Sequence, residues 1–125
     1  MKTQLKKELS NIGDFENPRI SLEQYRTPPG LAADLLHTAY MQDDIKDQKV
    51  ADLGAGTGML GLGARLLGAE VVAVEKEDDA VRLLGENAEM LGLEAEVVQQ
   101  DIEEFDQEVD TVLMNPPFSH HSDIG

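Results

Sequence analysis

The chain has 125 residues, of which 41% are hydrophobic, enough for one domain with a modest core and too few for two. It contains no cysteine, which excludes disulfides, thiolate zinc sites and cysteine nucleophiles. Acidic residues number 25 against 10 basic ones, so the net charge is −15 at pH 7.

The predicted elements alternate between helices and short strands. An amphipathic helix is expected before Gly13, and a second helix should begin after Thr27, whose side chain can cap it, with Pro28 at its first position. The apolar pattern then predicts strands at 49–53, 71–74, 94–99 and 109–114, a helix at 59–67, and a helix that Asp78 or Asp79 caps and Gly92 ends. This order predicts an α/β fold, with a mainly parallel sheet, helices on both faces and ligands at the carboxyl ends of the strands.

The acidic residues are spread over every segment and form no tail. Their mutual repulsion weakens a folded state in dilute buffer, whereas in molar salt the Debye length falls to roughly 3 Å. The composition therefore favours a protein of a salt-rich cytoplasm, with an ordinary acidic domain as the alternative. No apolar stretch approaches the roughly 20 residues of a membrane span, and no hydrophobic region follows the N-terminal lysines, so we expect a cytoplasmic protein without a membrane anchor.

A glycine-rich turn follows the first predicted strand. It reads Asp-Leu-Gly-Ala-Gly-Thr-Gly at 52–58, with glycines at Gly54, Gly56 and Gly58. Alternate glycines let the backbone turn tightly and approach a ligand closely. The spacing differs from the dinucleotide-binding pattern, and Asp52 would repel a pyrophosphate but suit the ammonium of an amino-acid moiety. A plain strand-to-helix turn is the alternative.

Two further acids follow the next two predicted strands. Glu75 comes about 20 residues after the first glycine, where a carboxylate can accept hydrogen bonds from both hydroxyls of a ribose. Asp101 follows the third strand, where it could accept a hydrogen bond from an adenine amino group. A ligand made of amino acid, ribose and adenine fits these acids and the glycines, and S-adenosylmethionine has that composition. Solvated side chains are the alternative reading of both acids.

The sequence Asn115-Pro116-Pro117-Phe118 follows the last predicted strand. The Asn115 amide oxygen and the Pro116 carbonyl are two acceptors on a short arc, and neither proline has an N–H to compete for them. They suit a planar exocyclic NH2 group, whose lone pair would then point at an electrophilic methyl, while Phe118 stacks on the ring. Catalysis would be mostly alignment and hydrogen bonding. A rigid strand exit with a buried phenylalanine is the alternative.

Taken together, these motifs resemble class I S-adenosylmethionine-dependent methyltransferases that modify an amino nitrogen. Leu-Glu-Gln-Tyr-Arg-Thr-Pro at 22–28 narrows the resemblance to the methyltransferase-like protein five family, adenosine-N6 methyltransferases of small-subunit ribosomal RNA. The resemblance implies a Rossmann-like fold, S-adenosylmethionine as cofactor and S-adenosylhomocysteine as product. It also implies that Gln24, Tyr25 and Thr27 close over the methionine end of the cofactor.

The resemblance divides the chain into an N-terminal helical extension at 1–20 and the N-terminal part of a methyltransferase domain at 21–125. Class I methyltransferases continue for several further strands, so we expect this fold to be incomplete at its C-terminus. The implied partners are ribosomal RNA and a small zinc-binding activator subunit, and the chain itself is expected to hold no metal. An archaeal, halophilic member of the family would explain the acidic composition.

Several readings stay open. The Asn-Pro-Pro-Phe motif is shared with guanine-N2 RNA methyltransferases and protein-glutamine methyltransferases, so these are alternative functions. A third alternative is a fragment that binds the cofactor without turnover. Arg26 stands where the family often has proline, and the sequence assigns no role to His120 and His121.

Overall fold

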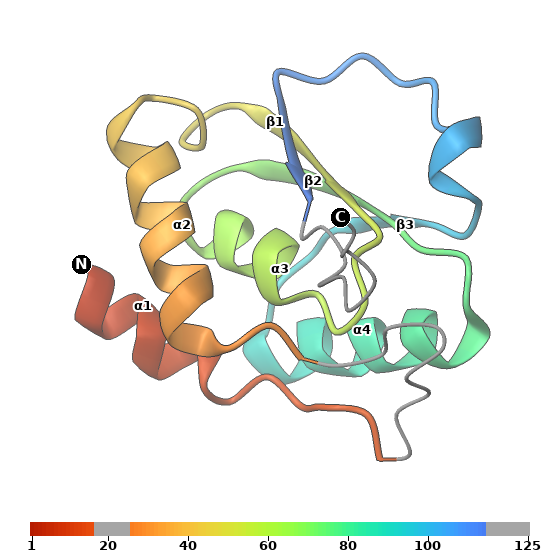
Figure 1. The fold of residues 1–125 in the computed structure, drawn as a ribbon, viewed down its shortest axis with the longest axis horizontal. Coiled ribbons are helices and arrows are strands. Elements are labelled where there is room, and N and C mark those ends of the chain that lie inside the picture. The colour runs from red at the N-terminus through yellow and green to blue at the C-terminus, as the bar shows by residue number, and fades with distance from the viewer. Residues whose placement is uncertain (17–25, 115–125) are drawn as a thin grey trace, which may run out of the picture.

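The computed structural model describes residues 1–16 and 26–114. Figure 1 shows helices packed beside a small central sheet. In chain order the elements are α1 (Lys2–Leu9), α2 (Pro29–Met41), β1 (Lys49–Leu53), α3 (Met59–Leu66), β2 (Glu70–Val74), α4 (Asp78–Leu91), β3 (Glu96–Val98), the 3₁₀ turn η2 (Ile102–Glu104) and β4 (Thr111–Met114). The predicted α/β order is confirmed in this part of the chain.

The four strands form one parallel sheet in the order β3-β2-β1-β4. Leu53, the last residue of β1, pairs with Val74 of β2 and with Met114 of β4. The strands therefore end together at one edge of the sheet, where β1 leads into the turn that starts at Gly54 and where β4 reaches its last residue, Met114. Ligands of open parallel sheets bind at this carboxyl edge.

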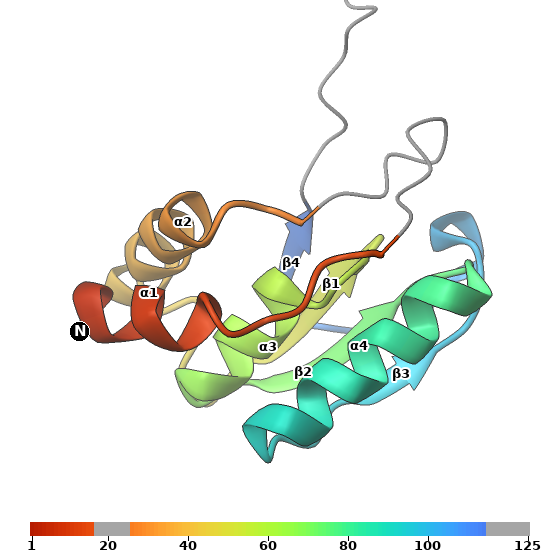
Figure 2. The same cartoon turned by 90° about the horizontal axis from the view of Figure 1, so that it is seen from below.

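The described helices lie on one face of the sheet, as Figure 2 shows from below. Val50, Val71 and Leu113 point to this face and are buried in the core that α1, α2 and α3 form with it. Ala73 points to the same face and packs against Leu84 of α4. The core therefore lies between this face of the sheet and the four helices, and it includes the N-terminal helix.

Helices on the second face, which the sequence predicted, are not found in the described residues. The connection from β3 to β4 must pass β2 and β1, and it contains η2 but no α-helix. This connection carries acids at Glu103, Glu104, Asp106 and Glu108, without the apolar repeat that a helix needs to bury one side.

Two helix starts also differ from the predicted ones. The N-cap of α2 is Pro28, not Thr27, because Pro28 has an extended ψ of 134° and the helix begins only at Pro29. The N-cap of α4 is Glu77, and Asp79 instead accepts a hydrogen bond from the Ala80 N–H (2.9 Å). Within the described residues, no helix is both long enough and apolar enough to cross a bilayer.

Candidate functional site

The glycine loop at 54–58 connects β1 to α3 at the carboxyl edge of the sheet. The Gly54 and Ala55 N–H groups both donate to the Val74 carbonyl (2.8 and 3.0 Å), which fastens the loop to the end of β2. Gly54, Gly56 and Gly58 all have positive φ, at 73°, 56° and 91°. A Cβ on Gly54 or Gly56 would meet no heavy atom of residues 1–16 and 26–114 within 4 Å, so these residues leave space in which a ligand can approach the backbone.

Glu75 lies beside this loop, one residue after β2. Its exposed fraction is 9%, and both carboxylate oxygens accept backbone hydrogen bonds: Oε1 from Gly56 N–H (2.8 Å) and Oε2 from Glu77 N–H (3.1 Å). Each carboxylate oxygen can accept a further hydrogen bond, because a carboxylate offers about four lone-pair sites. Glu75 thus holds the glycine loop and can still accept hydroxyl donors from a ligand.

Asp52 lies beneath the loop with an exposed fraction of 2%. Its Oδ2 accepts a hydrogen bond from the Gly61 N–H (2.8 Å) in the first turn of α3, where backbone donors have no partner within the helix. Burial raises the pKa of Asp52 from 3.8 to about 7; the Gly61 hydrogen bond opposes this shift, and the negative charge of Glu75 adds to it. When ionised, Asp52 and Glu75 near the ends of adjacent strands favour a positively charged ligand group.

Asp101 has local partners of its own. It caps η2, since its side chain accepts a hydrogen bond from Glu103 N–H (3.0 Å) and the Glu104 side chain accepts one from its own N–H (3.1 Å). Its Oδ2 also lies 3.7 Å from the Lys76 ammonium. Asp101 therefore lies shortly after the end of β3, the strand that comes after Glu75 in the chain. The adenine contact that the sequence predicts for Asp101 stays a prediction.

The remaining predicted site residues divide between the described and undescribed parts of the chain. Thr27 is described and is buried. Those that lie outside the described residues are Gln24, Tyr25, Asn115, Pro116, Pro117 and Phe118, together with His120 and His121. Arg26, which stands where the family often has proline, donates a hydrogen bond to the Ile12 carbonyl (2.9 Å). This residue therefore contacts the segment that follows α1.

Asn87 is a buried polar residue next to the loop that the sequence did not suggest as part of a site. It lies on α4, and its Nδ2 donates to the Thr57 carbonyl (2.9 Å) inside the glycine loop. Its position could have given a signal, because it stands three residues after Leu84 and four before Leu91, on a helix face that is otherwise apolar.

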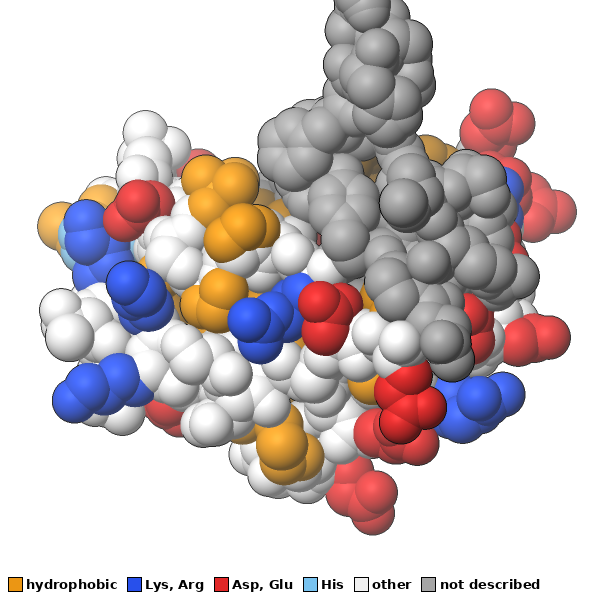
Figure 3. Space-filling model, turned by 60° about the horizontal axis from the view of Figure 1, so that its bottom comes forward, with side chains coloured by type: hydrophobic (Ala, Val, Ile, Leu, Met, Phe, Trp, Pro, Cys, Tyr) orange, Lys and Arg blue, Asp and Glu red, His pale blue; other side chains and the backbone are white. Residues whose placement is uncertain are grey.

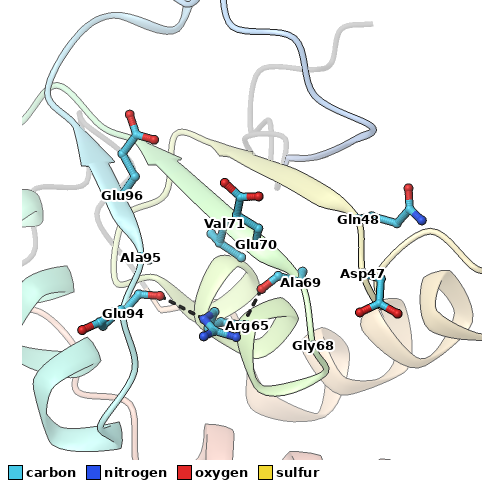
Figure 4. A pocket seen from close by; sticks show the side chains of 10 residues that line it. All are labelled: Asp47, Gln48, Arg65, Gly68, Ala69, Glu70, Val71, Glu94, Ala95 and Glu96. Atoms are coloured by element: carbon cyan, nitrogen blue, oxygen red, sulfur yellow. Dashed lines mark hydrogen bonds between the residues drawn. The ribbon is translucent and has the colours of Figure 1, made fainter.

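A hollow of about 660 Å³ opens at the opposite, amino-terminal edge of the sheet (Figure 4). Its acidic lining residues are Asp47, Glu70, Glu94 and Glu96. The one basic side chain that lines it, Arg65, donates to the carbonyls of Glu94 (3.1 Å) and Ala69 (3.4 Å). The described residues contain no cluster of three or more His, Cys, Asp or Glu that could hold a metal ion. The glycine loop is therefore the better candidate site.

Comparison with known proteins identifies several related chains. The methyltransferase small domain model matches residues 31–125. The rRNA N(6)-adenosine-methyltransferase METTL5 of Danio rerio is 47% identical over 57 residues, which make up 45% of this chain and 28% of that protein.

Two solved structures extend the comparison. A putative RNA methyltransferase from Pyrococcus horikoshii has a TM-score of 0.88 at 49% identity, and the match covers 94% of this chain and 60% of that one. The T. thermophilus 16S rRNA N2 G1207 methyltransferase, solved with AdoMet and guanosine, has a TM-score of 0.61 at 33% identity, covering 71% of this chain and 26% of that one. The matches thus span 60% of the Pyrococcus horikoshii chain and less than a third of the other two relatives.

Proposed function

Because the chain belongs to the methyltransferase small domain family, we propose that it binds S-adenosylmethionine at the glycine loop and Glu75. We further propose that it transfers the methyl group to an exocyclic amino nitrogen, adenine N6 of small-subunit ribosomal RNA. When bound, the cofactor supplies an electrophilic methyl group. The chain's own residues hold the cofactor and orient the nitrogen that attacks.

The described residues fit this cofactor. The described part of the chain leaves open space beside Gly54 and Gly56, so an amino-acid moiety can lie against the backbone there. The nearby carboxylates of Asp52 and Glu75 favour the positive charges of an ammonium and a sulfonium, and Glu75 keeps acceptor capacity for ribose hydroxyls. The T. thermophilus relative was solved with AdoMet, which supports the same ligand here. Asp101 is proposed for the adenine end, and Gln24, Tyr25 and Thr27 for the methionine end.

One observation carries the transfer reaction: Leu53 pairs with Met114 at the carboxyl edge of the sheet. Leu53 precedes Gly54 of the glycine loop, and Met114 precedes Asn115 of the Asn-Pro-Pro-Phe motif. The two motifs therefore follow neighbouring strands on the same edge. We propose that the Asn115 amide oxygen and the Pro116 carbonyl accept both protons of the target NH2 group, while Pro117 rigidifies the turn and Phe118 stacks on the base.

The related proteins favour RNA over protein as the substrate. METTL5 acts on adenosine N6 in rRNA, and the T. thermophilus relative acts on guanosine N2 in 16S rRNA. Adenine N6 is preferred because the Danio rerio protein has the higher identity, and guanine N2 is the second candidate. Transfer to ribosomal RNA would place the protein in the cytoplasm.

A small zinc-binding activator subunit remains part of the proposal. Val112 and Met114 of β4 are 51% and 43% exposed on the sheet face that points away from the described helices, so this face offers apolar surface to a partner or to further parts of a longer chain. Co-purification from the native host, with mass spectrometry of the captured subunit, tests this partner.

Transfer of a radiolabelled methyl group from S-adenosylmethionine to small-subunit ribosomal RNA tests the reaction. We expect labelled N6-methyladenosine from the wild type and none from Asn115→Ala, with cofactor affinity in that variant unchanged within a few-fold. Labelled N2-methylguanosine would favour the second candidate, and methylated glutamine in release factor would favour a protein substrate. Cofactor binding without any transfer would support a binding fragment.

A further inference from the structure

Asn87 carries a side-chain amide into the apolar face of α4. It is only 4% exposed, and it follows the buried Leu84 by three residues. Burying an amide is unfavourable unless its donors and its acceptor find hydrogen-bond partners. The hydrogen bonds of the Asn87 amide therefore indicate its role in the fold.

The amide of Asn87 has three hydrogen bonds to two distant segments. Its Oδ1 accepts from the Gly13 N–H (2.8 Å), and its Nδ2 donates to the Gly13 carbonyl (3.2 Å) and to the Thr57 carbonyl (2.9 Å). Only an amide offers one acceptor and two donors in this arrangement. Asn87 thus joins the segment after α1 to the glycine loop.

Both segments that Asn87 joins are firmly held elsewhere. Leu9 and Ile12, just before Gly13, are buried in the core with exposed fractions of at most 1%. In the glycine loop, Gly56 N–H donates to Glu75. The loop is therefore held on one side by Glu75, through Gly56 N–H, and on the other by Asn87, through the Thr57 carbonyl.

We propose that Asn87 is a positioning residue of the cofactor site, which fixes the Thr57 peptide of the glycine loop and makes its orientation depend on the Gly13 segment. The inference rests on the proposed function, because it assigns the N-terminal segment a part in cofactor affinity. Loss of the amide should leave the sheet and Glu75 in place while the loop samples other conformations.

The test compares full-length variants by two measurements, the Kd for S-adenosylhomocysteine from calorimetry and the free energy of unfolding from urea titration. Asn87→Asp keeps the acceptor for Gly13 N–H but puts a carboxylate against two carbonyls, and we expect about tenfold weaker binding. Ile45→Ala is the matched control, because Ile45 is fully buried just before β1, at the other edge of the sheet. It should lose comparable stability yet bind within about twofold of the wild type.

Gly13→Ala disturbs the hydrogen bonds between Gly13 and Asn87 and leaves the sequences of α4 and the glycine loop unchanged. An added Cβ would lie 3.2 Å from Asn87 Oδ1, so the amide must shift. We expect affinity to fall by about three- to tenfold. Unchanged affinity in both Gly13→Ala and Asn87→Asp would overturn the proposal and leave Asn87 a residue of the core alone.

Amide hydrogen exchange decides the proposal independently of any ligand. We expect the Gly56 and Gly58 amides to exchange at least about tenfold faster in Asn87→Asp and Gly13→Ala than in Ile45→Ala at matched stability. Equal exchange in all three variants would contradict the proposed positioning. If the wild type failed to bind S-adenosylhomocysteine, the proposed function would fail. The exchange rates would still test whether Asn87 positions the glycine loop.

Discussion

Asp52, the residue before the last of β1, carries a carboxyl group that is almost completely buried and accepts a hydrogen bond from the Gly61 N–H (2.8 Å). A buried negative charge is costly, and a buried carboxyl group responds by holding its proton to higher pH. Burial raises the pKa of Asp52 to about 7, so this carboxyl group titrates near neutral pH in the folded protein. The negative charge that a cationic ligand would meet is thus only partly present before binding.

Asp52 should therefore make stability depend on pH. In the unfolded chain the carboxyl group loses its proton near 3.8, so between about pH 4 and 7 the folded state binds more protons than the unfolded state. The stability that the folded protein gains from proton binding by Asp52 is fully present below pH 3.8. It is lost as the pH rises through 7, and the total loss is roughly 2–4 kcal/mol at most. Urea titrations from pH 5 to 8 measure this slope.

Asp52→Asn keeps an acceptor for Gly61 N–H but cannot ionise, so this variant should lose that part of the slope and exceed the wild type in stability at pH 8. Asp34→Asn is the control, because Asp34 is an exposed residue of α2 and should leave the slope unchanged. A slope in Asp52→Asn equal to that of the wild type would contradict the assignment.

For single residues, the sequence predicts a site residue where its position follows from the neighbouring strand, turn and helix. The glycines, Glu75 and Asp101 were placed at strand ends because a strand, a turn and a helix can each be recognised from neighbouring residues. Two hydrogen bonds could not be predicted, the one from Gly56 N–H to Glu75 and the one from Gly13 N–H to Asn87. They connect residues that only the packing of separate elements brings together.

Among the elements, α3 shows how close packing supports the site. This helix starts at the end of the glycine loop, and nearly all of its residues are buried, as expected of a helix covered on all sides. Gly63 faces α2 and α1, where an added Cβ would overlap Leu36 Cδ1 and come within 3.3 Å of Leu9 Cδ2. The absence of a side chain at Gly63 lets three helices meet.

Gly63→Ala should therefore destabilise the fold by roughly 1–3 kcal/mol, because the extra methyl overpacks this contact. Gly85→Ala is the matched control in α4. An added Cβ there meets no atom of the described residues within 4 Å, and alanine should stabilise the helix by about 0.5–1 kcal/mol. Free energies of unfolding from urea titration give both values. Equal stability of Gly63→Ala and the wild type would show that α3 packs less closely than described.

The elements were predicted well where the apolar period was strong. The strand at 49–53 has the predicted limits, and α4 ends at Gly92 as predicted, since an apolar run and a left-handed glycine are local signals. The caps of α2 and α4 were wrong, because several polar residues compete for one helix start. The comparisons confirm that the chain belongs to a methyltransferase family and has the predicted fold class. The division after residue 20 falls outside the described residues and stays a prediction.

For the whole molecule, net charge is the dominant physical property. Figure 3 shows basic side chains near α1 and acidic side chains gathered mainly on the opposite side of the visible face. The basic residues in the last turn of α1 are Lys6 and Lys7. With a net charge of −15, repulsion between acids should weaken the folded state whenever it is not screened.

Salt should therefore stabilise the protein. We expect the thermal midpoint to rise by roughly 5–10 °C between about 0.1 M and 2 M KCl, because the Debye length shrinks from about 10 Å to below 3 Å. Glu86→Gln with Glu89→Gln, both on the exposed face of α4, should reduce this rise. An isosmotic sucrose series controls for effects that do not depend on ions. A midpoint that stays constant in KCl would contradict the screened-charge account.

The whole proposal depends on the glycine loop and Glu75 holding S-adenosylmethionine or its product. Isothermal titration calorimetry with S-adenosylhomocysteine in high salt tests this most directly, with Asp34→Asn as the surface control. We expect one site per chain in the wild type and in the control. In Glu75→Ala, affinity should be weaker by roughly 1.5–3 kcal/mol, about 10- to 150-fold. A wild type that binds nothing at millimolar ligand, or a Glu75→Ala variant with undiminished affinity, would contradict the account.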